Sequence, residues 1–341
     1  MSENQIIKID KGWMEKELIS HLTEKIGDKI SMRVYTVKPS STQMDFLSLS
    51  SFLTKIIPHY VYSIKEIEDD IERSLRRNEK AIRKSNTELD EHELIEIISS
   101  ERERVKIDTW IDIFNQSRIF FRKKGEDYIG GKYGELMLFA LVEGVLECKM
   151  IAHKIKHLTN VNDEVKGSDG IFLGDYQKNK AILFGESKIM KSLSGAIVDA
   201  LESINRYHND SENAHNRSHE LLIAREHIHK YDVDGVNIDE LYDRLDSTSD
   251  KYKEQLLVHP IILMYERSFI KDLQKKAKTH EEFNEMISIE LIKRFKRKKE
   301  VFDLINNHVG DHNLEHSFLD FFLIPVDDVS KFRAAMDDKL L

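Results

Sequence analysis

Residues 167–188 read GSDGIFLGDYQKNKAILFGESK, and this stretch decides the fold class. Two short apolar segments, Gly170–Leu173 and Ala181–Gly185, flank a polar loop that contains glycine, asparagine and aspartate. This pattern predicts two antiparallel strands joined as a β-hairpin. With the midpoint of the loop near residues 176–179, the expected register pairs Ile171 with Phe184 and Leu173 with Ile182.

Charged residues at the open end of this hairpin carry the predicted chemistry. In the expected register Asp169 lies opposite Glu186, about 4.5–5.5 Å away at Cβ. Two carboxylates this close repel each other unless a cation or a proton neutralises them, and they can share one Mg²⁺ or Mn²⁺. Lys188 shares a face with Glu186, and Ser187 points the opposite way, because strand side chains alternate. A metal ion here would polarise a phosphate and activate water, and Lys188 would stabilise the developing charge, which suits phosphodiester hydrolysis.

Two acids and a lysine also occur together by chance, and most surface Glu–Lys pairs are merely solvated. Two features favour a function here. The apolar run Ala181–Phe184 leads directly to Glu186, so this charge lies at the end of a buried strand and requires a partner or a role. Glycines beside both acids permit a close approach of the backbone, at Gly167, Gly170 and Gly185.

Apolar helices are expected on both sides of the hairpin, at Gly134–Lys149 and Ile189–His208. The order helix, strand, strand, helix predicts an αββα core within residues 131–208. Glu135 lies in the first turn of the first helix, where a carboxylate favours the helix start. It would also reach the edge of a metal site if this helix packs on the hairpin.

The remaining chain is expected to surround this core in an α/β fold with a mixed central sheet. Residues 1–124 form a predicted accessory region, largely helical, in which Ser63–Lys84 has apolar residues at helical spacing. Residues 125–341 hold the core motifs and a C-terminal extension. Apolar segments at 259–266 and 316–325 would add strands to the sheet, and Glu281–Ile305 would form one long basic helix.

Composition excludes several classes of protein. The 341 residues are 40% hydrophobic and 33% charged, which is too apolar for a disordered chain. A net charge of -9 argues against a generally basic nucleic-acid binder. The single cysteine, Cys148, excludes an internal disulfide and a cysteine-based zinc cluster. Neither a P-loop nor a Gly-x-Ser-x-Gly elbow is present. No apolar run approaches the roughly 20 residues of a membrane helix, so we expect a cytoplasmic protein without membrane contact.

The helix glutamate, the aspartate and the Glu-x-Lys motif, in this order, resemble the PD-(D/E)xK nuclease superfamily with its restriction-endonuclease-like fold. More narrowly, KYGELMLFALVEGVL, GSDGIF and ILFGESK resemble the HamA family, the nuclease subunits of the bacterial Hachiman anti-phage defence system. The resemblance covers about Gly131–Ala200. One position departs from the superfamily pattern, because Ser168 stands where a proline commonly precedes the aspartate.

The resemblance implies a metal-dependent DNA nuclease. Asp169 and Glu186 would be metal ligands, Lys188 the catalytic lysine, and Glu135 the helical acidic residue that completes the metal site. The implied metal is Mg²⁺ or Mn²⁺. The implied partners are DNA and a HamB-like superfamily 2 helicase, which would hold the nuclease inactive until it engages damaged or invading DNA.

Two other functions stay open at this point. The chain could be a non-catalytic subunit that keeps the nuclease fold and binds DNA or a partner, although such relatives lose a member of the acid–acid–lysine set and all members are present here. A metal-dependent phosphatase for small molecules has no support beyond the metal. The basic run Lys293–Lys299 is either a contact to the phosphate backbone or the solvated face of a helix.

Overall fold

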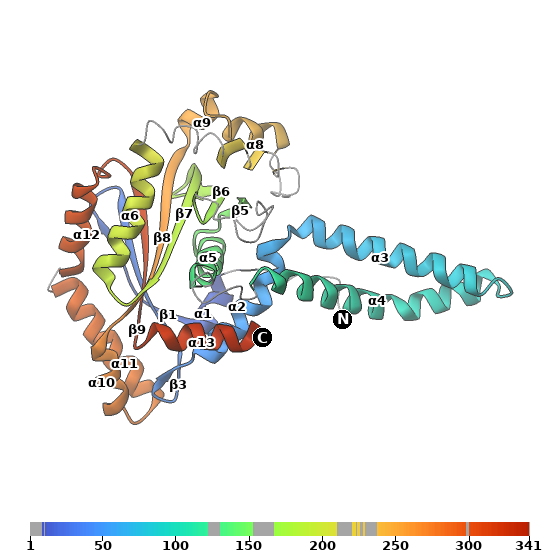
Figure 1. Cartoon of the computed structure of the whole chain (residues 1–341), viewed down its shortest axis with the longest axis horizontal. Helices are drawn as coiled ribbons and strands as arrows, with labels where there is room; N and C mark the ends of the chain where they lie inside the picture. Colours follow the sequence, from blue (N-terminus) through green and yellow to red (C-terminus); the bar gives the residue numbers. More distant parts are fainter. Residues whose placement is uncertain are drawn as a thin grey trace.

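A seven-stranded mixed sheet forms the centre of the molecule (Figure 1). This computed structural model describes residues 9, 11–121, 130–152, 167–209, 220–222, 224–225, 228, 237–297 and 300–340. Across the sheet the strands are β1 (Leu18–Ile26), β2 (Ile30–Val37), β9 (Phe318–Val326), β8 (Leu256–Glu266), β7 (Asn179–Met190), β6 (Gly170–Tyr176) and β5 (Lys149–Ala152).

Parallel and antiparallel pairs are combined in this sheet, as expected. The four central strands β2, β9, β8 and β7 pair in parallel. Antiparallel strands flank them, β1 on one side and β6 with β5 on the other. The α/β class, the mixed sheet and the two added strands β8 and β9 are therefore confirmed.

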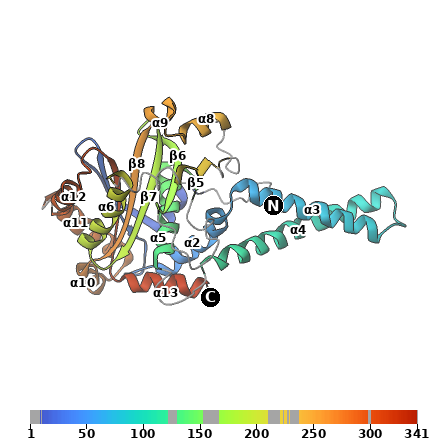
Figure 2. The same ribbon diagram turned by 45° about the horizontal axis from the view of Figure 1, so that its top comes forward.

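The predicted boundary at residue 124 cuts through this sheet. Strands β1 and β2 belong to the region expected to be accessory, yet β2 pairs directly with β9 near the end of the chain. The segment that does stand apart is a helical hairpin of α3 (Ile64–Ser85) and α4 (Glu91–Ile119). It projects from the sheet as a long arm (Figures 1 and 2).

Sequence signals explain both helices of the arm. Ser63 and Asp90 each form a capping box with a glutamate three residues later, which satisfies backbone N–H groups at the helix start. Helix α4 has 29 residues, and α3 matches the helix predicted over Ser63–Lys84. Arg83 of α3 donates to both carboxylate oxygens of Glu91 at 2.9 and 3.0 Å, which ties the helices together near the tip of the arm.

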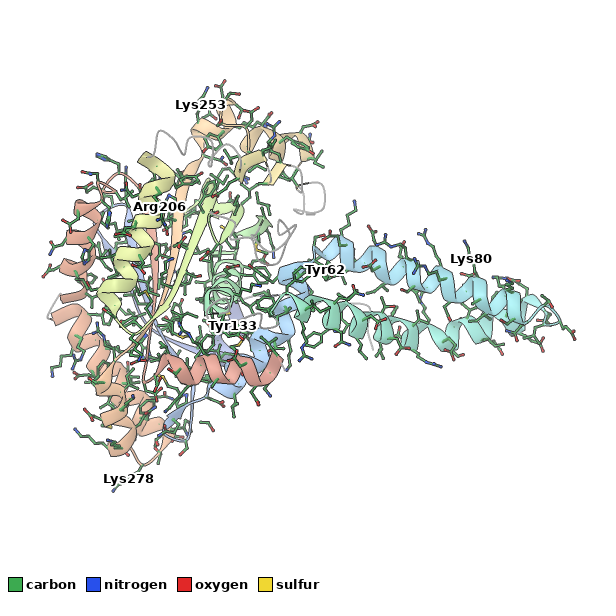
Figure 3. The ribbon with its side chains drawn as sticks, viewed as in Figure 1. Tyr62, Lys80, Tyr133, Arg206, Lys253 and Lys278 are labelled. Carbon is green, nitrogen blue, oxygen red and sulfur yellow. The ribbon has the colours of Figure 1, made fainter. Side chains whose placement is uncertain are left out.

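Helices cover both faces of the sheet (Figure 1). On one side lie α5 (Gly130–Leu141), α2 (Phe46–Val61) and α13 (Val329–Leu340), and on the other lie α6 (Leu193–Asn209) and α12 (Glu300–Asp311). Figure 3 shows side chains filling the space between α5 and α13, where the hydroxyl of Tyr133 donates to Asp337 at 2.5 Å. The shorter elements are α1 (Lys11–Glu17), β3 (Pro39–Ser40), β4 (Gln43–Met44), α8 (Ile238–Arg244), α9 (Asp250–Glu254), α10 (Ser268–Lys276) and α11 (His280–Ile292).

The structure has one strand, β5, that the predicted αββα order did not include. The helix predicted over Gly134–Lys149 ends earlier, because α5 passes into a π-helical turn, Val142–Leu146, and Glu147 adopts a left-handed backbone with φ of 56°. Strand β5 follows, so the order is α5, β5, β6, β7, α6. Cys148 lies in the core at this junction, and burial raises the pKa of its thiol to about 12.

The long basic helix expected over Glu281–Ile305 is also interrupted. Helix α11 ends at Ile292, a π-helical turn covers Lys293–Arg297, and α12 begins at Glu300. None of the helices within the described part of the chain combines the length and the apolar character that a membrane crossing requires.

Candidate functional site

The β6–β7 hairpin has the predicted register. Ile171 pairs with Phe184 and Leu173 pairs with Ile182, and the ladder ends at Gly170 and Gly185. One residue further out, the N–H of Asp169 donates to the carbonyl of Gly185 at 2.9 Å. Asp169 is therefore still attached to β7 at the open end of the hairpin, next to Glu186.

The carboxylate of Asp169 is held by Ser187. It accepts the backbone N–H of Ser187 at 2.8 Å and the Ser187 hydroxyl at 2.7 Å, and both residues are buried. Two donors on one carboxylate oxygen fix the rotamer of this side chain. No role had been predicted for Ser187. Its place between two predicted site residues was the signal that could have pointed to it.

Glu186 and Lys188 form an ion pair with 2.7 Å between Nζ and Oε1. The side chain of Glu186 is 7% exposed and that of Lys188 is 25% exposed, so the lysine is the member that reaches toward solvent. Their contact agrees with the prediction that residues two apart in the strand share a face. The pair places a cation and an anion beside Asp169.

The middle of α5 packs against Ser187. Because α5 begins at Gly130, Glu135 is its sixth residue and does not lie in the first turn as predicted. A Cβ atom on Gly134 would lie 2.7 Å from the Ser187 hydroxyl, and one on Gly185 would lie 2.6 Å from a methyl of Leu138. A Cβ atom at either position would require the side chain of Ser187 or Leu138 to shift, so the two glycines allow α5 to approach β7 this closely. Glu135 is thereby brought to β7 next to the residue that binds Asp169.

Glu135 lies in a buried polar group at the root of the arm. It accepts the hydroxyl of Tyr60 at 2.8 Å. One turn earlier in α5, the ammonium of Lys132 donates to the carbonyl of Phe120 at 2.6 Å. Burial lowers the pKa of Lys132, and the negative charge of Glu135 opposes that shift. Tyr60 had not been predicted, since only the folded chain places it beside Glu135. Lys132 was missed because the helix was expected to begin at Gly134, whereas α5 begins at Gly130.

The two faces of β7 carry different parts of the site. Gly185 and Ser187 face α5, whereas the ring of Phe184 lies 4.5 Å from that of Tyr207 on α6. Alternation along the strand therefore directs Glu186 and Lys188 toward the α6 face. Within the described residues, no group of three or more His, Cys, Asp or Glu side chains is arranged to hold a metal ion.

The basic run is partly engaged within its own helix. Arg294 binds Glu290 at 2.7 Å and lies over the ring of Phe269, and Lys293 is 3.6 Å from the same glutamate. Phe295 is buried. The side chains of residues 296–300 lie outside the described part of the chain. The two basic residues of the run whose side chains are described therefore have protein partners of their own.

A comparison of the sequence with known protein families finds one match. The family model for HamA matches residues 9–340, which is nearly the whole chain. No curated protein matches the sequence. The match extends far beyond residues 131–200, where the motifs themselves are found. The chain therefore belongs to the HamA family, which implies a component of Hachiman antiviral defence.

Proposed function

We propose that this protein is a metal-dependent nuclease that hydrolyses phosphodiester bonds of DNA as the effector of a defence complex. One observation carries the proposal. Asp169, Glu186 and Lys188 lie at one end of the β6–β7 hairpin, and Ser187 connects Asp169 to α5 at Gly134, next to Glu135 in the chain. Buried carboxylates beside a lysine are costly unless the site has a function.

Each residue has a proposed task. Asp169 and Glu186 would bind Mg²⁺ or Mn²⁺, with water and substrate oxygens as the remaining ligands. The bound ion supplies the positive charge that activates water and polarises the phosphate. Lys188 would orient the attacking water or neutralise charge on the phosphate. Glu135 would add a negative charge at the α5 side, and its place as a direct ligand stays a prediction.

The donor set fits a hard divalent ion, because it consists of carboxylate oxygens. Ser187 contributes preorganisation, since its two hydrogen bonds keep Asp169 in one orientation before any ion binds. The ion pair with Glu186 keeps the ammonium of Lys188 close to the site of reaction. An incoming phosphate would compete for that ammonium.

DNA and a HamB-like helicase are the proposed partners. The net charge of -9 favours a protein that needs another subunit to deliver DNA. Such a partner would also keep a destructive enzyme inactive until DNA is engaged. Membership of the HamA family and the charge of the chain support both statements.

Plasmid cleavage tests this proposal. The purified chain is incubated with DNA in Mg²⁺, in Mn²⁺ and in EDTA, with and without the helicase encoded beside it. We expect metal-dependent cleavage that Glu186→Gln and Lys188→Met each reduce at least about 100-fold. Lys180→Met is the matched control, because Lys180 lies on the same strand with its side chain 57% exposed and should leave cleavage unchanged.

The alternatives correspond to distinct results. Cleavage that survives both substitutions would place the active site elsewhere. Absence of cleavage in every condition, on DNA and on RNA, would favour a non-catalytic subunit that uses this fold for binding. Cleavage seen only with the helicase would support the nuclease and its control by that partner.

A further inference from the structure

The carboxylate of Glu220 binds Ser168, the residue that precedes Asp169. One of its carboxylate oxygens accepts the backbone N–H of Ser168 at 2.9 Å, and the other accepts the Ser168 hydroxyl at 2.7 Å. The two residues are 52 positions apart in the sequence. A bidentate contact of this kind fixes both the backbone and the side chain of Ser168.

The helical segment that carries Glu220 is anchored in the core. Leu221, Ala224 and Ile228 are buried, and they pack in one apolar cluster with Ile171 of β6 and Phe184 of β7. These strand residues lie on the face toward which alternation directs Glu186. Glu220 therefore approaches the open end of the hairpin from a segment whose apolar side chains are buried on that face.

Gly167 leaves the space that this carboxylate occupies. A Cβ atom at Gly167 would lie 2.7 Å from a carboxylate oxygen of Glu220, closer than such atoms come. Ser168 provides the matching donors. The proline that the superfamily pattern carries at this position has neither an N–H nor a hydroxyl, so it could make neither hydrogen bond. The departure from the pattern and the contact with Glu220 thus belong together.

We propose that Glu220 is a positioning residue for Asp169. Ser168 is held by Glu220, and Asp169 is held by Gly185 through its N–H and by Ser187 through its carboxylate. The first contact fixes where the chain enters the site, and the other two fix the carboxylate itself. This inference rests on the proposed function, because positioning matters only if Asp169 binds a metal ion.

Binding of Mn²⁺ to the full chain, measured by isothermal titration calorimetry, tests the inference without relying on cleavage. We expect Glu220→Ala to weaken Mn²⁺ binding by about 10-fold or more, as groups that orient metal ligands commonly do. Glu220→Gln keeps one acceptor oxygen and should recover part of that loss. Ser168→Ala removes one hydrogen bond without changing the charge, and it should weaken binding by about threefold, a smaller part of the same effect.

Two controls separate positioning from other effects. Glu202→Ala removes an exposed carboxylate from α6 and should leave Mn²⁺ binding unchanged. Thermal unfolding of each variant reports folding, and a purely structural role would lower the melting temperature without shifting the Mn²⁺ dissociation constant. The Mn²⁺ concentration for half-maximal cleavage should shift in parallel with that constant.

The outcomes distinguish this inference from the proposed function. Glu186→Gln should abolish Mn²⁺ binding if the metal site is correct. If it does so while Glu220→Ala and Ser168→Ala bind Mn²⁺ like the unaltered chain, the positioning role is wrong and the nuclease proposal stands. If Glu220→Ala weakens binding but Ser168→Ala has no effect, charge alone acts and positioning through Ser168 is wrong. If the unaltered chain binds no Mn²⁺, both proposals fail.

Discussion

Buried carboxylates lie at both ends of the β6–β7 hairpin, and their surroundings differ. At the turn end, Asp320 of β9 accepts two hydrogen bonds from Arg33 at 2.9 and 3.0 Å and one from the hydroxyl of Tyr176 at 3.0 Å. One carboxylate faces one guanidinium there. At the open end, Asp169 and Glu186 share their surroundings with Lys188.

The turn end is a structural junction. Asp320 is fully buried, and its partners come from β2 and β6, on opposite sides of it in the sheet. Near the same turn, Lys25 of β1 donates to Gln177 at 3.3 Å. The hairpin turn thus contacts β1. The ion pair of Arg33 with Asp320, together with the hydroxyl of Tyr176, joins β2, β9 and β6.

The open end has more negative than positive charge. Glu135, Asp169 and Glu186 are all buried, and the nearby cations are Lys188 and Lys132. An arrangement of this kind lowers stability, and proteins keep it where a bound cation or a reaction requires it. We therefore assign Asp320 to the stability of the fold, and Asp169 and Glu186 to the proposed chemistry.

The largest effect on stability is expected at the turn end. Arg33→Met leaves Asp320 buried without its cation, so it should lower the free energy of unfolding by about 3–5 kcal/mol. Urea denaturation measures this loss. Mn²⁺ binding by the folded protein should not change, and a second substitution, Asp320→Leu, should recover much of the stability. A loss below about 1 kcal/mol would contradict a structural role for this pair.

High pH should weaken the same end through Tyr176. Burial and the nearby charge of Asp320 raise the pKa of Tyr176 from 10.0 to about 12. Because the unfolded chain releases this proton first, stability is lost as the pH rises from about 10 to 12, by up to roughly 2–3 kcal/mol. Tyr176→Phe should remove that part of the dependence. Equal slopes for the two proteins in urea denaturation across this range would refute the prediction.

A smaller effect is expected at the root of the arm. Tyr60→Phe removes the hydroxyl that donates to buried Glu135, and it should lower the free energy of unfolding by about 1–2 kcal/mol. Tyr62→Phe is a suitable control, because this half-buried tyrosine, labelled in Figure 3, lies two residues further along. Equal losses in the two variants by thermal denaturation would show that the contact with Glu135 contributes little.

The smallest effect on stability is expected at the open end itself. Glu186→Gln removes one of several neighbouring negative charges while Lys188 loses a partner, so the free energy of unfolding should change by less than about 1 kcal/mol. Asp320→Asn, the matched change at the turn end, should cost about 3 kcal/mol. Comparable losses in urea denaturation would mean that Glu186 serves the fold in the same way as Asp320.

Local patterns predicted the centre of this protein well. Alternation and turn residues within 22 positions were sufficient for the register of β6 and β7, because neighbouring strands in a hairpin follow from local sequence. The left-handed residue Glu147 was not predictable in this way, and β5 was therefore missed. Of the arm, only the helix at Ser63–Lys84 was predicted, because α4 is stabilised by α3 and by its cap rather than by a strong apolar stripe.

The candidate site was likewise predicted only in part. Asp169, Glu186, Lys188 and Glu135 were found from residue types and spacing. Tyr60 and Glu220 were not, since each acts through a contact with a segment that lies far away in the sequence. Ser187 was also missed, although it lies in the same hairpin as Asp169. Nothing in the sequence near Glu220 indicates that it binds Ser168.

The sequence by itself determined the hairpin, its register and the identity of the charged residues at its open end, because these depend on side-chain alternation over a few residues. Only the tertiary structure decided that β1 and β2 join the same sheet, that α5 approaches β7 at Gly134, and that Glu220 reaches Ser168. Those contacts join segments tens to hundreds of positions apart, and packing of the whole core selects them.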